Sequence, residues 1–379
     1  MTAESVFTNG RIVLEDRILS GTVVIRDGHI VAIDEGRSAA GENLDGDYLI
    51  PGLVELHTDH LETHHTPRPA VHWPKLAAIQ SYDGQIASCG ITTVFDCLRL
   101  GSDEDGRFAD NAMRDMAGAL MSARADGRLK ADHFIHLRCE VSSHDVIDQF
   151  ETFGDVDIVR LASLMDHAPG QRQFQTMEQF TLYYKTMRGL SDEEFDAYVA
   201  RRQAASATYS DRHRTTIAEA ARGRGITLAS HDDATQAHVD EAIALGVRLA
   251  EFPTSLAAAD ASHKAGLSVL MGAPNIVRGK SHSGNIAARD LAARGTLDVI
   301  SSDYVPYSLI HAPFVLAEQV AGVRLPEAIA MVTATPARAV GLADRGRIAE
   351  GLRADLVRVR VADGVPIVRG VWRSGERIA

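Results

Sequence analysis

Histidines and carboxylates are concentrated in one short stretch of the sequence. Residues 54–69, VELHTDHLETHHTPRP, contain four histidines and three carboxylates in sixteen positions. If the preceding apolar run is a strand, His57 and Asp59 point to the same face, because strand side chains repeat with a period of two. Both could then bind one cation at the end of that strand. A helix start or a solvated loop would accommodate the other three histidines as readily as a substrate contact would: His60, His64 and His65.

Four more side chains that can bind metal end other apolar segments: Glu140, His167, His231 and Asp303. Alone, each has a simpler explanation, since a strand-end histidine is usually a hydrogen-bonded core residue, Glu140 could pair with Arg138, and Asp303 could cap a turn. Together they indicate a metal centre, because mixed imidazole and carboxylate ligands suit zinc, manganese or iron. We predict a divalent cofactor, zinc first with manganese or iron open, as one or two ions bound by six residues: His57, Asp59, Glu140, His167, His231 and Asp303.

Eight apolar segments of strand length, separated by longer helical stretches, must position these residues. They cover residues 49–57, 90–98, 133–141, 156–167, 226–233, 247–255, 268–275 and 298–304. Strands that are buried on both faces and alternate with helices are parallel, and eight of them favour a closed (β/α)8 TIM-like barrel in the α/β class. The C-terminal strand ends of such a barrel carry its chemistry, so the six predicted ligands would share one rim.

Both ends of the chain show a different, antiparallel pattern. Short β segments alternate with turn signals, and three dipeptides are typical of two-residue hairpin turns: Asn9-Gly10, Asp27-Gly28 and Asp363-Gly364. The simplest account is that the two ends pair with each other. The middle of the chain is then inserted into the domain that they form.

These patterns give a domain organisation. We predict a small β-sandwich domain from residues 1–50 and 345–379, and a barrel from residues 51–344. The helical stretch at 175–224 is longer than one crossover needs, and it could cover the barrel mouth as a lid.

Composition restricts the class of protein. Hydrophobic residues at 45% and charged residues at 24% are typical of an ordinary globular protein. The formal net charge of -12 argues against a nucleic-acid partner, since phosphate backbones are bound by basic surfaces. Three cysteines without CxxC spacing predict neither a disulfide framework nor a cysteine zinc site. Without a recognisable signal peptide or membrane span, we expect a cytoplasmic protein with no membrane partner.

Several longer motifs resemble the amidohydrolase superfamily: PGLVELH at 51–57, GITTVFD at 90–96, SSD at 301–303 and the tail TATPARAVGLADRGRIAEGLRADLV. Others resemble one of its families, the phosphonate-metabolism diphosphatases that act on α-D-ribose 1-methylphosphonate 5-triphosphate in the carbon-phosphorus lyase pathway: HTDHLETHHTPRP, SLMDHAPGQRQF, LASHDDAT, AEFPTS, MGAPNIVRGKSHSGN and SSDYVP. The resemblance covers nearly the whole chain. It implies a metal-dependent hydrolase that cleaves between the α and β phosphates, giving the 5-phosphate and pyrophosphate.

The sequence departs from the superfamily pattern at two predicted strand ends. The usual first motif is His-x-His, whereas this chain has His57-Thr58-Asp59, so a carboxylate replaces one imidazole. The sixth strand offers Glu251 where a histidine is usual. We therefore keep His167 among the predicted ligands and hold Glu251 as a reserve ligand.

The resemblance also suggests roles in catalysis and substrate binding. The SSD motif positions Asp303 to take the proton of the attacking water, which is compatible with metal binding. Cationic and polar groups must meet the substrate, and eight residues are candidates: Arg68, Arg172, Asp232, Asp233, Arg278, Lys280, His282 and Ser283. Arg68 and Arg172 could equally form structural ion pairs. Asp232 and Asp233 could instead orient metal ligands or hold a ribose hydroxyl.

Two other functions fit parts of the pattern. A cyclic amidase or nucleobase deaminase could use the same scaffold, because fold alone does not fix the substrate. A neutral heterocycle would not require so many basic residues at the rim, however. The second alternative is a non-catalytic barrel that acts as a scaffold, and the full ligand set argues against it. The superfamily resemblance also favours a homo-oligomer that acts on a small molecule.

Overall fold

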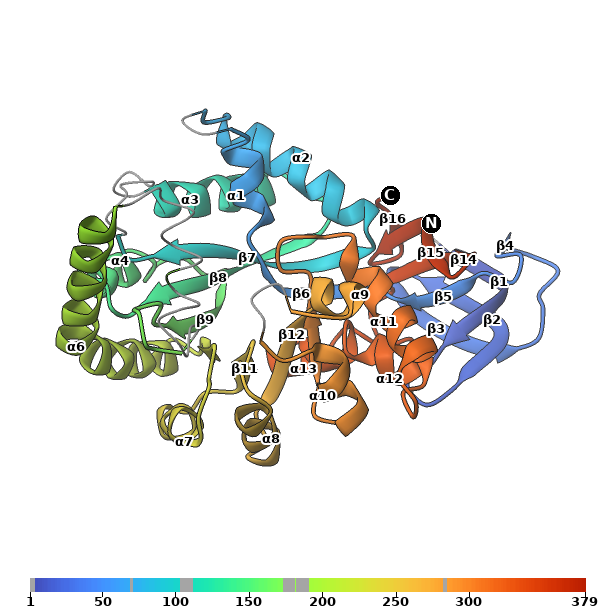
Figure 1. The fold of residues 1–379 in the computed structure, drawn as a ribbon. Coiled ribbons are helices and arrows are strands. Elements are labelled where there is room, and N and C mark those ends of the chain that lie inside the picture. Colours follow the sequence, from blue (N-terminus) through green and yellow to red (C-terminus); the bar gives the residue numbers. More distant parts are fainter. Residues whose placement is uncertain (1–3, 69–70, 103–111, 173–180, 182–190, 282–284) are drawn as a thin grey trace. The chain divides into compact units, whose positions relative to one another are not determined.

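The computed structural model describes residues 4–68, 71–102, 112–172, 181, 191–281 and 285–379 (Figure 1). The chain divides into two compact units. Residues 1–96, 119–134 and 271–379 belong to the first unit, and residues 97–118 and 135–270 belong to the second unit. The described residues form two sheets of eight strands each.

Strands from both ends of the chain form one sheet within the first unit (Figure 1). Its order is β16-β15-β14-β5-β1-β2-β3, with β4 paired to β1. β5 connects the two ends of the chain, because it pairs in parallel with β1 and antiparallel with β14. The predicted pairing of the two ends of the chain in one sheet is therefore confirmed, while the domain bounds stay a prediction. The strand bounds are β1 Glu4–Val13, β2 Ile18–Arg26, β3 His29–Glu35, β4 Glu42–Asn43, β5 Tyr48–Pro51, β14 Leu356–Ala362, β15 Val365–Arg373 and β16 Glu376–Arg377.

Two of the three predicted hairpin turns are confirmed. Asp27-Gly28 connects β2 to β3 and Asp363-Gly364 connects β14 to β15, with positive φ at every one of these residues. The prediction for Asn9-Gly10 is wrong, because this dipeptide lies inside β1, where the pairing with β2 shifts register. The Asn-Gly signal marks a β-bulge here, since Asn9 tolerates a φ of 58° within the strand.

The terminal sheet buries its own apolar cluster. Residues from both ends of the chain contribute to it, and the Phe7 ring meets the Trp372 ring edge-on at 4.7 Å between centroids. Burial of this apolar surface therefore holds the two termini together. The cluster contains Phe7, Ile12, Leu19, Val23, Ile25, Ile30, Leu44, Leu49, Ile348, Ala354, Leu356 and Trp372.

The second sheet contains eight strands in chain order from β6 to β13, which confirms the predicted set. Neighbouring strands pair in parallel, as in β9 with β10 and β10 with β11. A bridge between Thr58 and Asp303 joins the two end strands, so the sheet closes into a barrel. The strand bounds are β6 Leu53–Thr58, β7 Ile91–Leu100, β8 Asp132–Glu140, β9 Val159–Met165, β10 Thr227–His231, β11 Leu249–Glu251, β12 Ser268–Gly272 and β13 Val299–Ser301.

The first predicted strand, 49–57, is divided between the two sheets. Its first half is β5 of the terminal sheet, and its second half is β6 of the barrel. Gly52 stands between them, and a Cβ atom there would lie 2.2 Å from Thr92 Oγ1. Only glycine allows this close approach, so the chain can pass directly from one sheet into the other.

Helices connect the barrel strands. None of the described helices has the length and apolar character needed to cross a membrane. The bounds are α1 His60–His65, α2 Lys75–Ser88, α3 Ala112–Ala125, α4 Val146–Glu151, α6 Asp192–Gly223, α7 Gln236–Leu245, α8 Leu256–Lys264, α9 Ala273–Arg278, α10 Ala288–Arg294, α11 Ser308–Gln319, α12 Leu325–Ala330 and α13 Ala334–Ala339.

A buried histidine ties α2 to two barrel strands in the first unit. His133 of β8 lies between Asp83 of α2, 3.1 Å from Nε2, and Asp96 of β7, 2.7 Å from Nδ1. Burial by itself lowers the pKa of His133, but the two carboxylates outweigh it and raise the pKa to about 9. The side chain is therefore an imidazolium at neutral pH, held by two fixed anions.

Candidate metal centre

Three predicted ligands of the first unit meet where the barrel closes. His57 lies in β6, Asp59 follows that strand, and Asp303 follows β13. The Asp303 N–H donates to His57 O at 3.0 Å, and the Asp59 N–H donates to Asp303 O at 3.3 Å. Backbone bonds therefore hold these residues at one point of the first unit. That these strand ends carry the site stays a prediction.

Glu55 holds His57 and the segment after β13 in place, and the sequence analysis did not predict this role. Its carboxylate is fully buried and accepts the N–H groups of His57 and Ser302, each at 2.6 Å. Burial raises the pKa of Glu55 to about 7, although these N–H groups favour the ionised form. One side chain thus connects β6 to the end of β13. A carboxylate inside an apolar strand was the available sequence signal.

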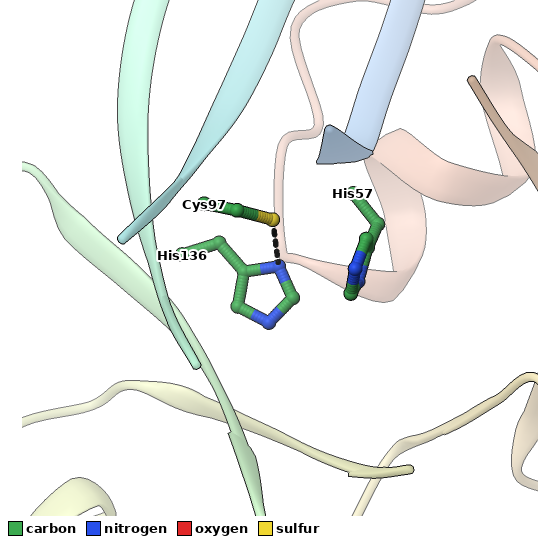
Figure 2. Close-up of side chains that lie close together, drawn as sticks. All are labelled: His57, Cys97 and His136. Carbon is green, nitrogen blue, oxygen red and sulfur yellow. Dashed lines mark hydrogen bonds between the residues drawn. The ribbon is translucent and has the colours of Figure 1, made fainter. Parts of the chain in front are cut away.

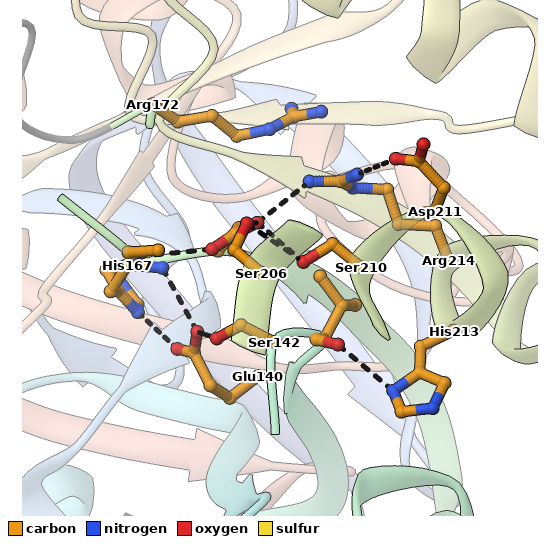
Figure 3. Close-up of polar contacts among 12 residues, drawn as sticks. Glu140, Ser142, His167, Arg172, Ser206, Ser210, Asp211, His213 and Arg214 are labelled. Atoms are coloured by element: carbon orange, nitrogen blue, oxygen red, sulfur yellow. Dashed lines mark hydrogen bonds and ion pairs between the residues drawn. The ribbon is translucent and has the colours of Figure 1, made fainter. Parts of the chain in front are cut away.

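In the second unit, Glu140 ends β8 and contacts His167, which lies two residues beyond β9 (Figure 3). The His167 Nδ1 atom lies 2.6 Å from Glu140 Oε2, and the His167 N–H donates to Glu140 Oε1 at 3.1 Å. Ser142 and Arg202 also donate to Oε1, at 2.6 and 3.3 Å. Burial opposes ionisation of Glu140, but His167, Arg202 and Ser142 together hold its pKa far below the ordinary value. Glu140 is therefore a fixed anion that orients His167.

His167, His231 and Asp232 place three possible ligand atoms together in the second unit. The atoms all lie within 4.8 Å of one another. Asp232 Oδ2 is 3.8 Å from His167 Nε2 and 3.6 Å from His231 Nε2. Asp232 Oδ2 is buried and has no hydrogen-bond partner among the described residues. A buried carboxylate oxygen left without a donor beside two imidazole nitrogens suits a divalent cation, so the residues present fit a bound metal.

Glu251 lies behind His231 and not beside Asp232. Its Oε2 atom is 3.1 Å from His231 Nδ1, which is the ring nitrogen opposite the one near Asp232. Ser163 donates to the same oxygen at 2.7 Å. A carboxylate on the far nitrogen of a metal-binding histidine is a common orienting partner. The geometry thus favours an orienting role for Glu251, while its role as a reserve ligand stays a prediction.

Arg172 and Asp233 form a buried ion pair in the second unit. The Arg172 guanidinium donates to Asp233 and also to Glu241, and the arginine side chain is 4% exposed. Ser230 donates to the other Asp233 oxygen at 2.5 Å. Of the two readings left open by the sequence, this geometry favours the structural ion pair for Arg172. It favours the orienting role for Asp233, which follows the His231-Asp232 pair.

The other predicted cationic residues are exposed. Arg68 lies in the loop after α1, Arg278 is the last residue of α9, and Lys280 follows it. Gly279 ends that helix with a φ of 76°, which lets the chain turn directly after Arg278. His282 and Ser283 were predicted in the same segment and lie outside the described residues.

The three histidines left open by the sequence make contacts with protein groups. The ring centroids of His60 and His64 lie 6.4 and 5.8 Å from the centroid of the buried Tyr82 ring. His64 Nε2 is 2.7 Å from Gln85 Oε1 of α2, and His65 Nδ1 is 2.8 Å from Trp73 O. These contacts fix α1 against α2 and against the loop that follows α1.

Among its described residues, the predicted lid at 175–224 contains the long helix α6. α6 begins after Ser191, which caps it together with Glu194 in a capping box. Residues 175–180 and 182–190 of the predicted segment lie outside the part that the structure describes. One face of α6 binds the segments after β8 and β9 (Figure 3). Its contacts are Arg202 with Glu140, Ser206, Ser210 and Arg214 with Asp166, and His213 with Val141 O.

Comparison with known proteins supplies a family. The sequence matches the amidohydrolase family over residues 48–378. It is 45% identical over 376 residues to the alpha-D-ribose 1-methylphosphonate 5-triphosphate diphosphatase of Escherichia coli (strain K12), covering 98% of this chain and 100% of that protein. A shorter match of 103 residues, 41% identical, covers 24% of this chain and 26% of an imidazolonepropionase from Streptomyces griseus subsp. griseus.

Solved structures share the fold at low sequence identity. N-acetyl-D-glucosamine-6-phosphate deacetylase from Mycobacterium smegmatis has a TM-score of 0.66 at 16% identity, covering 99% of both chains. 5-Methylcytosine deaminase from Klebsiella pneumoniae has a TM-score of 0.66 at 15% identity, covering 99% of this chain and 98% of the other. These likenesses establish the architecture over the full chain.

Proposed function

The chain belongs to the amidohydrolase family, and on that premise we propose that it hydrolyses α-D-ribose 1-methylphosphonate 5-triphosphate. Cleavage lies between the α and β phosphates, so that the 5-phosphate remains on the ribose and pyrophosphate leaves. The observation that carries this proposal is the 45% identity to the diphosphatase over that protein's entire length. Identity at this level over a whole enzyme supports the same reaction in this chain.

Two donor sets would hold divalent metal. The first unit offers His57, Asp59 and Asp303, and the second unit offers His167, His231 and Asp232, with Glu140 bound to His167. Imidazole and carboxylate donors suit zinc, with manganese or iron as alternatives, and two sets are compatible with one or two ions. When bound, a divalent ion supplies a water acidified toward a pKa of about 7 and Lewis acidity toward a phosphoryl oxygen.

Asp303 acts as the general base. Its side chain is partly exposed at the end of β13, and its backbone is fixed by bonds to His57 and Asp59. A carboxylate held in this way takes the proton from the attacking water while a new phosphorus–oxygen bond forms. Positioned general bases are worth about 10²- to 10⁴-fold in rate.

Exposed cations bind the polyphosphate. Arg68, Arg278 and Lys280 are exposed at the surface of the first unit, so their charges are available to a tetraanionic chain of phosphates. His282 and Ser283, which follow Lys280 closely in the sequence, belong to the same proposed set of substrate-binding residues. Because the whole protein carries a net charge of -12, attraction of the substrate depends on such local positive charge. We assign Arg172 and Asp233 to holding the residues around His231.

We further propose a cytoplasmic homo-oligomer. All three cysteines lie in described segments and none forms a disulfide, which supports a reducing compartment. The oligomeric state rests on the resemblance to the superfamily alone, and sedimentation of the purified protein would test it.

Phosphorus NMR of the purified, zinc-loaded protein tests the reaction. With the 5-triphosphorylated ribose phosphonate as substrate, we expect pyrophosphate and the 5-phosphate as products. ATP serves as the control and should remain intact. Orthophosphate from either compound would show that a different linkage is cleaved, and cleavage of both would refute the specificity.

A further inference from the structure

Five polar side chains form a continuous buried chain through the second unit. They come from neighbouring barrel strands, and none is more than 6% exposed: Cys97, His136, Ser163, Glu251 and His231. The metal centre uses His231 and, as its orienting partner, Glu251. Polar groups are costly inside an apolar barrel unless they are fully hydrogen-bonded, so the other three require an explanation.

Each link of this chain is a direct contact. Cys97 Sγ lies 3.5 Å from His136 Nδ1 (Figure 2). His136 Nε2 is hydrogen-bonded to Ser163 Oγ, and Ser163 Oγ lies 2.7 Å from Glu251 Oε2. The same Glu251 oxygen lies 3.1 Å from His231 Nδ1. A buried hydrogen-bond path therefore joins a thiol in β7 to the imidazole that ends β10.

The direction of every bond follows from the chemistry of its ends. A carboxylate only accepts hydrogen bonds, so both Ser163 Oγ and His231 Nδ1 must donate to Glu251. Ser163 has a single hydroxyl hydrogen, so its oxygen must accept the hydrogen on His136 Nε2. A neutral His136 then has an unprotonated Nδ1, to which the Cys97 thiol donates. One assignment therefore satisfies all five residues.

This assignment fixes the tautomer of His231. With its hydrogen on Nδ1, the ring presents the lone pair of Nε2 toward Asp232 Oδ2, 3.6 Å away. We propose that Ser163 and His136 are positioning residues, which hold Glu251 and through it keep His231 in the tautomer and orientation that bind metal. The inference rests on the proposed function, because it takes His231 as a metal ligand.

Substitution of Ser163 gives the sharpest test. Ser163→Ala removes the hydroxyl that donates to Glu251 and accepts from His136, whereas Ser163→Thr keeps it. Ser262→Ala is the matched control, because Ser262 is also fully buried and its hydroxyl has no hydrogen-bond partner among the described residues. Zinc affinity would be measured on the metal-free, full-length proteins by competition with a chromophoric chelator.

We expect Ser163→Ala to weaken zinc binding by tenfold or more, since partners behind a metal-binding histidine are typically worth about 10- to 100-fold. Ser163→Thr should restore the affinity, and Ser262→Ala should bind zinc as the wild-type protein does. Equal affinity in Ser163→Ala and wild type would overturn the inference. A wild-type protein that binds no zinc would instead refute the metal centre of the proposed function.

A second measurement does not depend on whether the alanine variant folds. Nitrogen-15 NMR of histidine-labelled wild-type protein, free of metal, reports which ring nitrogen carries hydrogen. The signals would be assigned by their loss in His231→Asn and His136→Gln. We expect hydrogen on Nδ1 of His231 and on Nε2 of His136. The opposite tautomer at either residue would contradict the proposed path.

Discussion

Three residues leave the barrel strands with a left-handed backbone. Asp232, Phe252 and Asp303 have φ values of 59°, 52° and 55°. Their N–H groups still extend the strand ladders, to Glu251 O, Leu270 O and His57 O, so the strain arises where the chain leaves the sheet. Such a conformation costs a non-glycine residue roughly 1–3 kcal/mol and persists where its surroundings enforce it. Two of these residues are the aspartates to which we assign a function.

Asp303→Asn tests the general base. Asparagine tolerates the left-handed backbone as well as aspartate does, so the fold should be retained. We expect kcat to fall by at least about a hundredfold because the amide cannot take a proton. Steady-state kinetics with the triphosphate would measure the loss, and zinc content would serve as the control. Unchanged kcat would remove Asp303 from this role.

Asp232→Asn tests whether Asp232 is a metal ligand. From the sequence, Asp232 was predicted to bind substrate or to orient metal ligands. Its orphaned oxygen keeps its position but loses its charge, so zinc affinity should fall by at least about tenfold. Asp240→Asn is the control, because Asp240 is exposed on α7 of the same unit. Isothermal titration with zinc would compare the two variants. Equal affinities would exclude Asp232 as a ligand.

For single residues, the position of a candidate ligand at a strand end was predictable from the sequence. Its hydrogen-bond and ion-pair partners were not. His57, Glu140 and His231 follow from the rule that barrel chemistry lies at the C-terminal strand ends. An ion pair of Arg172 was one of two open readings, but its partners could not be predicted, because Asp233 and Glu241 are 61 and 69 residues away along the chain. For the same reason Glu251 stood as a reserve ligand, since its contact with His231 depends on the neighbouring strand.

At the scale of elements, α6 acts on the site through one face. Ser206, Ser210 and Arg214 recur at intervals of four residues and all bind Asp166 Oδ2, at 2.8, 2.7 and 3.2 Å. The helical character of the segment was predicted from the sequence, and the structure adds the capping box at Ser191. The attachment of α6 to Asp166 could not be predicted. In the sequence, a polar helix face that binds a buried carboxylate looks the same as one that faces solvent.

Asp166→Asn should loosen this attachment. It leaves the buried Arg214 without one of its anionic partners, and hydrogen bonds to charged groups are worth about 1.5–3 kcal/mol. We expect a lower urea midpoint and faster hydrogen exchange in α6. Asp211→Asn is the control, because Asp211 binds the same arginine but is 98% exposed. If both variants lose equal stability, burial is not what gives Asp166 its effect.

For the whole molecule, the sequence predicted both sheets and the contribution of both termini to one of them. Turn dipeptides and apolar periodicity are local signals, so eight barrel strands and the paired termini could be recognised. The contacts that hold the C-terminal segment to β8 could not be predicted, because they join residues far apart in the sequence. Asp132 at the start of β8 accepts hydrogen bonds from Arg345, Arg353 and Arg373, which follow it by more than 200 residues.

Asp132 makes the stability of the first unit depend on pH. Burial opposes its ionisation, but the three arginines outweigh burial and lower the pKa of Asp132. Its contribution is therefore complete above the ordinary pKa of about 4 and is lost as the pH falls through the lower folded value. Asp132→Asn should lower the melting temperature at pH 7 by a few degrees, about 2–4 °C for each kcal/mol lost.

Thermal melts between pH 7 and pH 3 would test this. The difference between wild type and Asp132→Asn should shrink toward the acid end, whereas Asp126→Asn, an exposed aspartate paired with Arg128, should track wild type. A gap that stays constant with pH would show that the charge of Asp132 is not responsible.

In the mechanism proposed here, hydrolysis of the triphosphate depends on metal bound by the histidines and aspartates at the barrel strand ends. The most direct test is to strip the protein of metal, verify this by mass spectrometry, and follow pyrophosphate release by phosphorus NMR as zinc is returned. We expect no pyrophosphate from the stripped protein and recovery of activity as zinc binds. Full activity in the verified metal-free protein would contradict it.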